Sequence, residues 1–374
     1  MNIPLLTITI EPRILTEEKV SANIRNVSSS SGGTSLPITQ IIMQWISDTH
    51  YRVSTLARSV VYLWGLPKED FQSFMESYAL FEADRVTNNE RLIVDYYRVL
   101  NHLCSIGQVE KMYIPPLLLA DKGIWYNQVE FETQMMKDIG LEPGMHVLEI
   151  GSGRGRVAAH VAQATENSTV TGVNIDTNQV KNAREFANQS QLSHRVRFVE
   201  QSYNEALPFP DNSFDAVYEI QALTYAKDYV ALFKEIHRVM KPGARISVLD
   251  WFLYDKFDSE NAEHQDMLQR TKKLIGAVRD PLPQEMAAAM ESVGFKIVKN
   301  ANASVNDVQY PLIDQADKYF TALQRVVNFF VAIWILPFHF KPLLQRLTLD
   351  GQVFVEGDKR GMWTSVHQIV AVKE

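Results

Sequence analysis

Three glycines at alternate positions make the segment of this sequence that is best suited to binding a ligand. The apolar run Val147–Ile150 comes first, Gly151-Ser152-Gly153-Arg154-Gly155 follows, and a helix-forming segment begins at Arg156. This order predicts a strand, a tight turn and a helix. Glycine adopts positive φ and has no Cβ, so a nucleotide-like molecule can approach such a turn closely. The alternative is a turn with a structural role only.

The spacing of the glycines and one acidic residue distinguish this turn from a dinucleotide site. The pattern is G-x-G-x-G, whereas the dinucleotide pattern G-x-G-x-x-G places a pyrophosphate on the helix N-terminus. Glu149, two residues before the first glycine, would repel a phosphate and attract a cationic group. The segment therefore favours a cofactor with a positive centre and no phosphate, and S-adenosylmethionine is the obvious candidate.

Composition limits the classes of protein to which the chain can belong. It has 374 residues, of which 46% are hydrophobic, and a formal net charge of -7, which is typical of a globular protein with a large core. No basic stripe is visible, which argues against nucleic acid as a partner. The single cysteine, Cys104, excludes an intrachain disulfide and favours a reducing compartment. The nine histidines form no H-E-x-x-H pattern, so no metal site is predicted.

Two segments bear on membranes. The N-terminus lacks the basic region and apolar run of a secretory signal, so a cytoplasmic protein is expected. The longest apolar stretch, residues 326–340, is shorter than the roughly 20 residues that a spanning helix needs. We expect a buried core helix there, with a lipid-facing or partner-facing helix as the alternative. Peripheral contact with an internal membrane and a homodimer both stay open.

Strand-like and helix-like segments alternate from residue 140 onward and predict an α/β fold. The implied βαβ units give a doubly wound, mostly parallel, seven-stranded Rossmann-like sheet that binds ligands at the carboxyl ends of its strands. The expected strands are residues 147–150, 169–174, 196–200, 214–218, 245–250, 295–298 and 368–372. The expected divisions are a flexible N-terminal segment (1–36), a helical cap (37–115), a cofactor-binding core (116–302) and an aromatic-rich substrate or dimer region that completes the sheet (303–374).

Four blocks in a fixed order resemble the class I S-adenosylmethionine-dependent methyltransferases. They are Val147–Gly155, Gly172–Asp176, Leu207–Val217 and Arg238–Gly243. Within that superfamily the chain resembles the sterol 24-C-methyltransferases, on Asp250-Trp251 and on residues 254–264 and 355–364. The likeness extends over residues 90–374 and implies a methyltransferase with S-adenosyl-L-methionine as its cofactor.

The resemblance assigns roles around the cofactor. Glu149 and the glycines would wall its methionine part, and the Asn174 amide, assisted by Gln179, would grip the ribose hydroxyls. Ser202 stands where the family usually has an aspartate that binds the adenine amine, and its shorter hydroxyl would act directly or through water. Ile175 and Tyr203 would sandwich the adenine, or pack in the core. The full expected set is Glu149, Gly151, Ser152, Gly153, Gly155, Asn174, Ile175, Gln179, Ser202 and Tyr203.

The acceptor side departs from the sterol enzymes. They carry Tyr-Glu-Tyr-Gly-Trp-Gly near their start, where this chain reads Cys104–Val109. After the fourth strand they read Ile-Glu-Ala-Thr-Cys-His-Ala, and here Gln221 replaces the glutamate and Tyr225 the histidine. The loss of these groups argues against a sterol itself as the acceptor.

Methyl transfer from a sulfonium is an in-line displacement, so the protein must align the reactants in a dry site. If the nucleophile is an alkene, a carbocation follows and needs electron-rich neighbours and a base. The expected catalytic residues are Tyr225 and Glu219 as cation stabilisers or bases, Gln221 as an orienting residue, and Tyr218 beside them. A solvated surface charge is the alternative for Glu219. The aromatic residues of 303–362 would wall an apolar acceptor pocket, or form core or a dimer interface.

Three functions follow from these residues. The first is methylation of carbon in an alkene of a bulky hydrophobic terpenoid, sterol-like or related natural product. The second is N- or O-methylation of a natural product on the same scaffold. The third is a non-methylating cyclase or isomerase that keeps the methyltransferase fold.

Overall fold

The computed structural model describes residues 53–81 and 90–374. The expected flexible segment 1–36 and the start of the expected cap lie outside the described residues. Residues 53–64 are helical, and α3 (Lys68–Ser77), η1 (Tyr78–Phe81) and α4 (Glu90–Ile106) follow. These helices agree with the helical region expected before the sheet.

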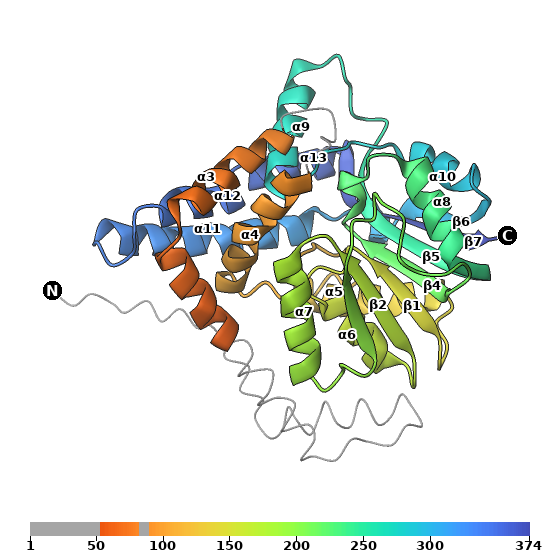
Figure 1. Ribbon diagram of the computed structural model, residues 1–374. Coiled ribbons are helices and arrows are strands. Elements are labelled where there is room, and N and C mark those ends of the chain that lie inside the picture. Colours follow the sequence, from red (N-terminus) through yellow and green to blue (C-terminus); the bar gives the residue numbers. More distant parts are fainter. Residues whose placement is uncertain (1–52, 82–89) are drawn as a thin grey trace. The chain divides into compact units, whose positions relative to one another are not determined.

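A seven-stranded sheet in the order β3-β2-β1-β4-β5-β7-β6 forms the centre of the described chain (Figure 1). Strands β1 to β5 are parallel, and β7 runs antiparallel to both β5 and β6. Their bounds are β1 His146–Ile150, β2 Thr169–Asn174, β3 Val196–Glu200, β4 Phe214–Ile220, β5 Met240–Leu253, β6 Phe295–Asn302 and β7 Trp363–Lys373. The predicted doubly wound, mostly parallel sheet is confirmed.

Helices cover both faces of this sheet because its strands are apolar on both sides. On one face α5 (Ile124–Asp138), α6 (Arg156–Ala164) and α7 (Thr177–Gln189) pack on residues such as Val147 and Val170. On the other face α8 (Tyr229–Val239) and α10 (Pro283–Glu291) pack on residues such as Leu148 and Val217. Successive residues of a strand therefore point to opposite layers, which decides below which side chains can reach a ligand.

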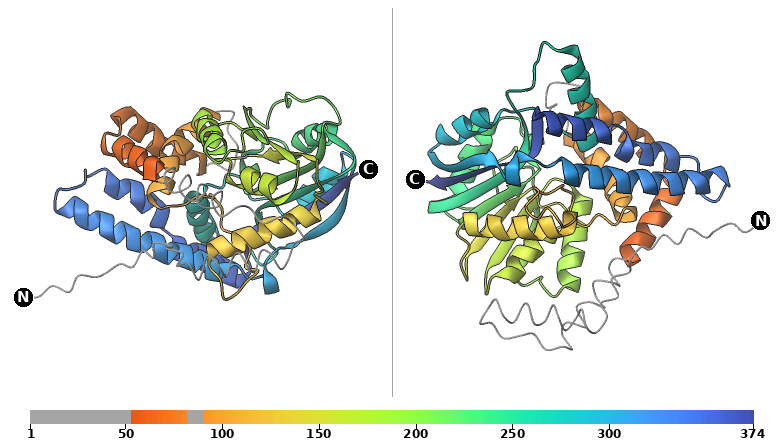
Figure 2. Two further views of the ribbon diagram at one scale, coloured as in Figure 1. Left: turned by 90° about the horizontal axis from the view of Figure 1, so that it is seen from below. Right: turned by 180° about the vertical axis from the view of Figure 1, so that it is seen from behind.

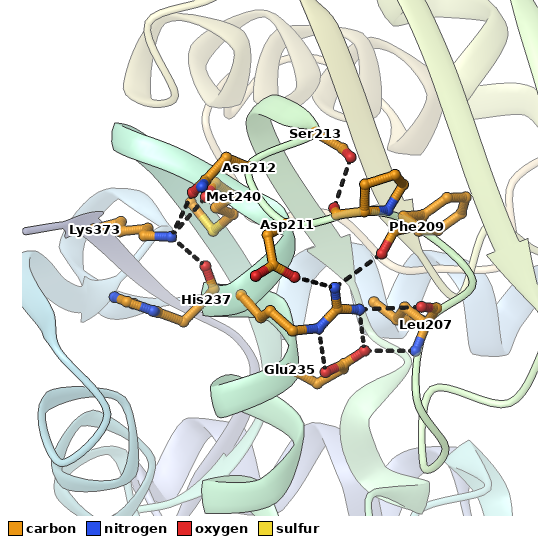
Figure 3. Close-up of polar contacts among 11 residues, drawn as sticks. Leu207, Phe209, Asp211, Asn212, Ser213, Glu235, His237, Met240 and Lys373 are labelled. Atoms are coloured by element: carbon orange, nitrogen blue, oxygen red, sulfur yellow. Dashed lines mark hydrogen bonds and ion pairs between the residues drawn. The ribbon is translucent and has the colours of Figure 1, made fainter.

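A polar network ties together the edge of the sheet where β4 begins and β7 ends (Figure 3). The Arg238 guanidinium donates to the carboxylates of Glu235 (2.6 Å) and Asp211 (2.7 Å) and to the carbonyls of Leu207 and Phe209. The Lys373 ammonium donates to the carbonyls of His237 (2.8 Å) and Met240 (2.7 Å) and to the Asn212 side chain (3.0 Å). Two of the blocks that resemble methyltransferases, residues 207–217 and 238–243, thus meet at the amino ends of the parallel strands, opposite the glycine turn. Their contacts there stabilise the fold.

The insertion between β6 and β7 packs on the helices that precede the sheet (Figure 2). It contains η3 (Val305–Asp307), α11 (Tyr310–Ala332), α12 (Phe340–Thr348) and α13 (Gly351–Arg360), while α9 (Ala262–Ile275) precedes α10. Leu343 and Leu344 of α12 join Phe74 of α3 and Leu103 of α4 in one buried cluster. Two segments more than 200 residues apart therefore build one helical layer.

The expectation of a buried core helix over residues 326–340 is wrong. The segment comprises the end of α11, a turn and the start of α12, and six of its apolar side chains are exposed. Its apolar residues outnumber the positions that face the helical layer, so the excess points outward. Among the described residues, no helix is long and apolar enough to cross a membrane.

Candidate active site

The glycine turn after β1 is shaped by positive φ angles that favour glycine. Gly151 (φ 70°) and Gly153 (φ 50°) both lie in this region. A Cβ on Gly151 would collide with Ala222, so the turn lies directly against the loop after β4. A Cβ on Gly153 would approach only Gln179 Oε1 (3.9 Å) and the carbonyl of Gly151 (4.0 Å). The turn therefore leaves open space beside Gly153.

That space belongs to a cavity of about 120 Å³ at the carboxyl ends of β1, β2 and β4, called here the glycine cavity. Nine of the ten expected cofactor residues line it: Glu149, Gly151, Ser152, Gly153, Asn174, Ile175, Gln179, Ser202 and Tyr203. The tenth, Gly155, is not part of its lining. A Cβ there would come within 2.9 Å of Ala183 and closer still to the Phe198 ring, so this glycine allows α6 to approach β3 and α7.

Glu149 is a buried carboxyl group facing this cavity. Its residue is 4% exposed, and its Oε2 atom accepts no hydrogen bond from the described residues. Burial and the charge of nearby Glu132 raise the pKa of Glu149 well above its usual range. A buried carboxylate with one oxygen left without a hydrogen bond is unfavourable, and a cationic ligand in the cavity would offset that cost. The position thus fits the positive cofactor expected from the sequence.

A hydrogen-bonded group near Glu149 could not be predicted from the sequence. Glu132 of α5 accepts from the Lys111 ammonium (2.7 Å) and from the Tyr113 hydroxyl (2.5 Å), and it pairs with His160 Nδ1 (2.5 Å). Burial opposes ionisation of Glu132, but the hydrogen bond from His160 and the charge of Lys111 prevail and lower its pKa. Lys111 and Tyr113 both line the glycine cavity, and no spacing rule links them to a residue on α5.

The two amides expected at the ribose lie in contact. Asn174 Nδ2 donates to Gln179 Oε1 (2.5 Å), and Gln179 Nε2 donates to Asn101 Oδ1 (2.9 Å) on α4. The Asp176 carboxylate caps α7 by accepting from the Gln179 backbone N–H (2.8 Å). These bonds fix the orientation of both amides at the cavity wall.

An acidic side chain from the cap approaches Ser202. The Ser202 hydroxyl donates to Glu90 Oε1 (3.0 Å), and the same oxygen accepts from Asn204 Nδ2 (3.3 Å) and the Lys227 ammonium (2.9 Å). Burial opposes ionisation of Glu90, but these hydrogen bonds lower its pKa. A carboxylate from α4, 112 residues earlier in the chain, therefore lies beside Ser202, where the resemblance implies an aspartate.

Two of the four expected catalytic residues line the glycine cavity. The Tyr225 hydroxyl donates to the Gly276 carbonyl (2.9 Å) and lies 3.5 Å from the Tyr97 hydroxyl. Gln221 (φ 52°) donates to the carbonyls of Ile114 (3.0 Å) and Ser365 (2.6 Å). These bonds hold both side chains rigidly at the loop after β4.

The other two, Tyr218 and Glu219, lie on β4 itself and line neither the glycine cavity nor the second cavity described below. Tyr218 is the register partner of Glu149 and lies in the layer of α5 and α6. Glu219 is 1% exposed, and its carboxylate accepts from the Ala222 backbone N–H. Burial and the charge of Asp250 raise the pKa of Glu219 well above its usual range. The alternative of a solvated surface charge is wrong for Glu219, because the residue is buried.

A second cavity, of about 280 Å³, lies under the cap and is called the apolar cavity. Many of its lining residues are aromatic and aliphatic side chains from α4, α9, α11 and α13, among them Tyr96, Leu100, Leu274, Ile313, Phe320 and Phe354. Five residues line both cavities: Tyr97, Lys111, Met112, Tyr113 and Gln221. The two cavities are therefore neighbours that share a wall.

Asp250, three residues before the end of β5, is the most deeply buried acid of the apolar cavity. Its Oδ2 accepts from the Leu223 backbone N–H (2.8 Å) and its Oδ1 from that of Trp251 (2.7 Å). Burial raises the pKa of Asp250 to about 7, despite these two hydrogen bonds. A carboxyl group with that pKa can give or take a proton near neutral pH.

Comparison with known proteins agrees with this geometry. The family model described as "Methyltransferase domain" matches residues 148–248. The chain is 29% identical over 253 residues to "Methyltransferase phqN" of Penicillium fellutanum, covering 68% of this chain and 73% of that protein. It is 29% identical over 339 residues to "Sterol 24-C-methyltransferase ERG6B" of Gibberella zeae, covering 82% and 86%.

Solved structures share the fold. The [4+2]-cyclase SpnF superposes with a TM-score of 0.62 at 19% identity, covering 76% of this chain and 96% of that one. The domain match, the strand order and the likeness along most of the chain together support a class I S-adenosylmethionine-dependent methyltransferase that is similar in sequence to the sterol 24-C-methyltransferases.

Proposed function

We propose that the protein transfers a methyl group from S-adenosylmethionine to an alkene carbon of a bulky hydrophobic natural product of terpenoid or sterol-like type. The observation that carries the proposal is the apolar cavity next to the glycine cavity, with Tyr97, Met112 and Gln221 in the shared wall. Small-molecule sites are typically apolar with a few placed polar groups, and this cavity matches that description. Residues 37–115 and 303–374 would enclose the acceptor, and the core of residues 116–302 would bind the cofactor.

The residues around the glycine cavity fit the cofactor. When bound, S-adenosylmethionine supplies an electrophilic methyl group. The Glu149 carboxylate would balance a positive charge, the turn at Gly153 leaves room for a ligand, and Asn174 with Gln179 would bind hydroxyl groups. Ser202 and the adjoining Glu90 carboxylate would accept from an amine.

Residues in the shared wall and on either side of it fit an alkene acceptor. The electron-rich faces of Tyr97 and Tyr225, whose ring centroids are 6.2 Å apart, would stabilise a developing carbocation. Asp250 would then take the proton that the cation loses, because each of its oxygens has a further lone pair beyond the one used by a backbone N–H. Gln221, fixed by two carbonyls, would orient the acceptor.

A second candidate is N-methylation of a basic natural product. It is favoured by two carboxyl groups, Asp250 and Asp317, in a wall that is rich in apolar side chains. A protonated amine would be held by these groups and would react after losing its proton. The likeness to the cyclase SpnF concerns the fold alone, so a reaction without methyl transfer has less support.

Isotope transfer tests these alternatives. The purified chain is incubated with methyl-labelled S-adenosylmethionine and, in turn, with terpenoid, sterol and alkaloid acceptors. A product heavier by the labelled methyl, with a new C-methyl resonance, is expected from an acyclic or cyclic terpenoid alkene. A new N-methyl resonance would select the second candidate, and conversion without label would overturn methyl transfer.

We further propose that the protein works in the cytoplasm in peripheral contact with an internal membrane. Its support is the exposed apolar segment between α11 and α12. A homodimer is the competing explanation of that segment.

A further inference from the structure

The turn between α11 and α12 exposes a cluster of apolar side chains, called here the apolar tip. Its members are Phe329, Phe330, Ile333, Trp334, Ile335 and Phe338. Trp334 is 94% exposed, Phe338 74% and Phe329 60%. The two helices lie side by side and end in this turn on the side away from the sheet (Figures 1 and 2). Single exposed apolar residues are normal, but six within ten residues make a surface that marks an interaction site.

The backbone at the tip gives no reason for an aromatic residue. Trp334 has φ 63°, in the left-handed region that usually follows a helix as glycine. Its N–H donates to the Val331 carbonyl (3.1 Å), and the N–H of Ile335 donates to the Phe330 carbonyl (2.9 Å), which closes α11. A large side chain at positive φ is unfavourable relative to glycine. The tryptophan is therefore not explained by the turn or by core packing.

The charge around the tip identifies the kind of partner. From residue 319 to residue 349 the chain has no aspartate or glutamate, but it has Arg325, Lys341, Arg346 and His339. The whole chain is acidic, with a net charge of -7. Arg325 and Lys341 are exposed on the same two helices as the tip. Two tips meeting in a symmetric dimer would bring like charges together, whereas an anionic lipid surface would attract them.

We propose that the apolar tip inserts into the headgroup region of an anionic lipid surface, with Arg325 and Lys341 binding the lipid charge. Tryptophan and phenylalanine favour that boundary, and a basic flank adds electrostatic attraction. The anchored helices also wall the apolar cavity, through Phe320 of α11 and Leu347 of α12. A membrane-dissolved acceptor would thus meet the enzyme at the surface where it resides. Lipid binding by the tip does not depend on which acceptor is methylated.

Vesicle flotation of the full chain tests the proposal. The protein is mixed with phosphatidylcholine vesicles that either contain or lack phosphatidylserine. We expect flotation with phosphatidylserine and a decrease at high salt. Trp334→Gly should lower the partition coefficient at least tenfold while keeping the fold, because glycine suits φ 63° at this position. Lys341→Glu should lower it more than fivefold, since one basic residue near such a surface contributes about that factor.

The control variant is Val298→Ser, which removes an exposed apolar side chain (51% exposed) from β6, away from the tip. It should float like the parent chain. The proposal is overturned if the parent chain does not float with anionic vesicles, or if Trp334→Gly floats equally well. It is also overturned if sedimentation shows a dimer that Trp334→Gly dissociates while flotation is unchanged, because a second copy would then cover the tip. Methylation of a detergent-dispersed acceptor should be the same in Trp334→Gly and Val298→Ser as in the parent chain. Failure of lipid binding is therefore separable from failure of the methyltransferase function.

Discussion

Replacing Gly155 and Gly153 by alanine, one at a time, separates two uses of glycine within the same turn. Both residues have positive φ, 74° and 50°, so each alanine costs about 1–2 kcal/mol of stability from backbone strain alone. At Gly155 the new methyl also collides with Phe198 and Ala183 in the buried layer of α6 and α7. Overpacking of a core adds about 1–3 kcal/mol. Gly155→Ala should therefore lower the free energy of unfolding by about 2–5 kcal/mol, from the sum of these two effects.

At Gly153 the methyl meets no atom closer than 3.9 Å and points into the glycine cavity. Gly153→Ala should therefore lose only about 1–2 kcal/mol of stability. It should weaken S-adenosylhomocysteine binding by about 5- to 150-fold if the steric conflict of about 1–3 kcal/mol is transferred to the ligand. Denaturant titration gives the first quantity and isothermal titration calorimetry the second. The assignment of the cavity to the cofactor is refuted if Gly153→Ala binds the nucleoside as tightly as the parent chain, or if both variants lose affinity equally while stability is unchanged.

Three further predictions concern ionisable groups at the two cavities. Glu149→Gln should weaken S-adenosylmethionine binding by about 10- to 100-fold, the value of a charged hydrogen bond. In the parent chain the affinity for S-adenosylmethionine should rise with pH, because the raised pKa of Glu149 makes the carboxylate available only as pH increases, and Glu149→Gln should remove this rise. Calorimetry in different buffers measures the proton release that accompanies binding. An unchanged pH profile in the variant would contradict the prediction. Glu90→Ala should reduce the affinity for S-adenosylhomocysteine several-fold, because Ser202 and its neighbours lose a hydrogen-bond acceptor. Binding of methionine alone should change little. If the variant binds S-adenosylhomocysteine as tightly as the parent chain, the adenine lies elsewhere. Asp250→Asn should lower kcat and abolish its increase as pH passes about 7, where burial places the pKa. The stability that the neutral Asp250 carboxyl confers is complete below about pH 4, near its unfolded pKa, and is lost as pH rises to about 7. Denaturant titrations of Asp250→Asn should therefore lack this pH dependence. If the pH dependence of kcat or of stability persists in the variant, Asp250 is not the group that titrates.

The strands of the sheet could be predicted because each depends on residues that are close together in the sequence. The runs Thr169–Asn174 and Val196–Glu200 are strands over the same residues that periodicity indicates. The glycine turn and the Asp176 cap of α7 likewise depend on neighbours in sequence. The cofactor side of the site follows from these elements, because parallel strands bring their carboxyl ends to one edge. Nine of ten expected residues therefore lie at one cavity. Gly155 lies outside its lining, because spacing does not show which glycine faces a cavity and which faces a helix.

The acceptor side depended on contacts that no pattern in the sequence encodes. Tyr218 and Glu219 are adjacent to a loop that lines the cavities, yet strand alternation turns one toward α6 and the other toward Asp250. Other groups line the shared wall: Tyr97 comes from α4 in the helical layer, and Lys111 from the segment between α4 and α5. In that layer α12 packs on α3 and α4 through buried apolar contacts. The apolar periodicity of each helix shows that it has a buried face, but it does not show which other helix packs on that face. A methyltransferase of this architecture can thus keep its cofactor site while the helices around the apolar cavity change, and we propose that these helices determine which acceptor enters.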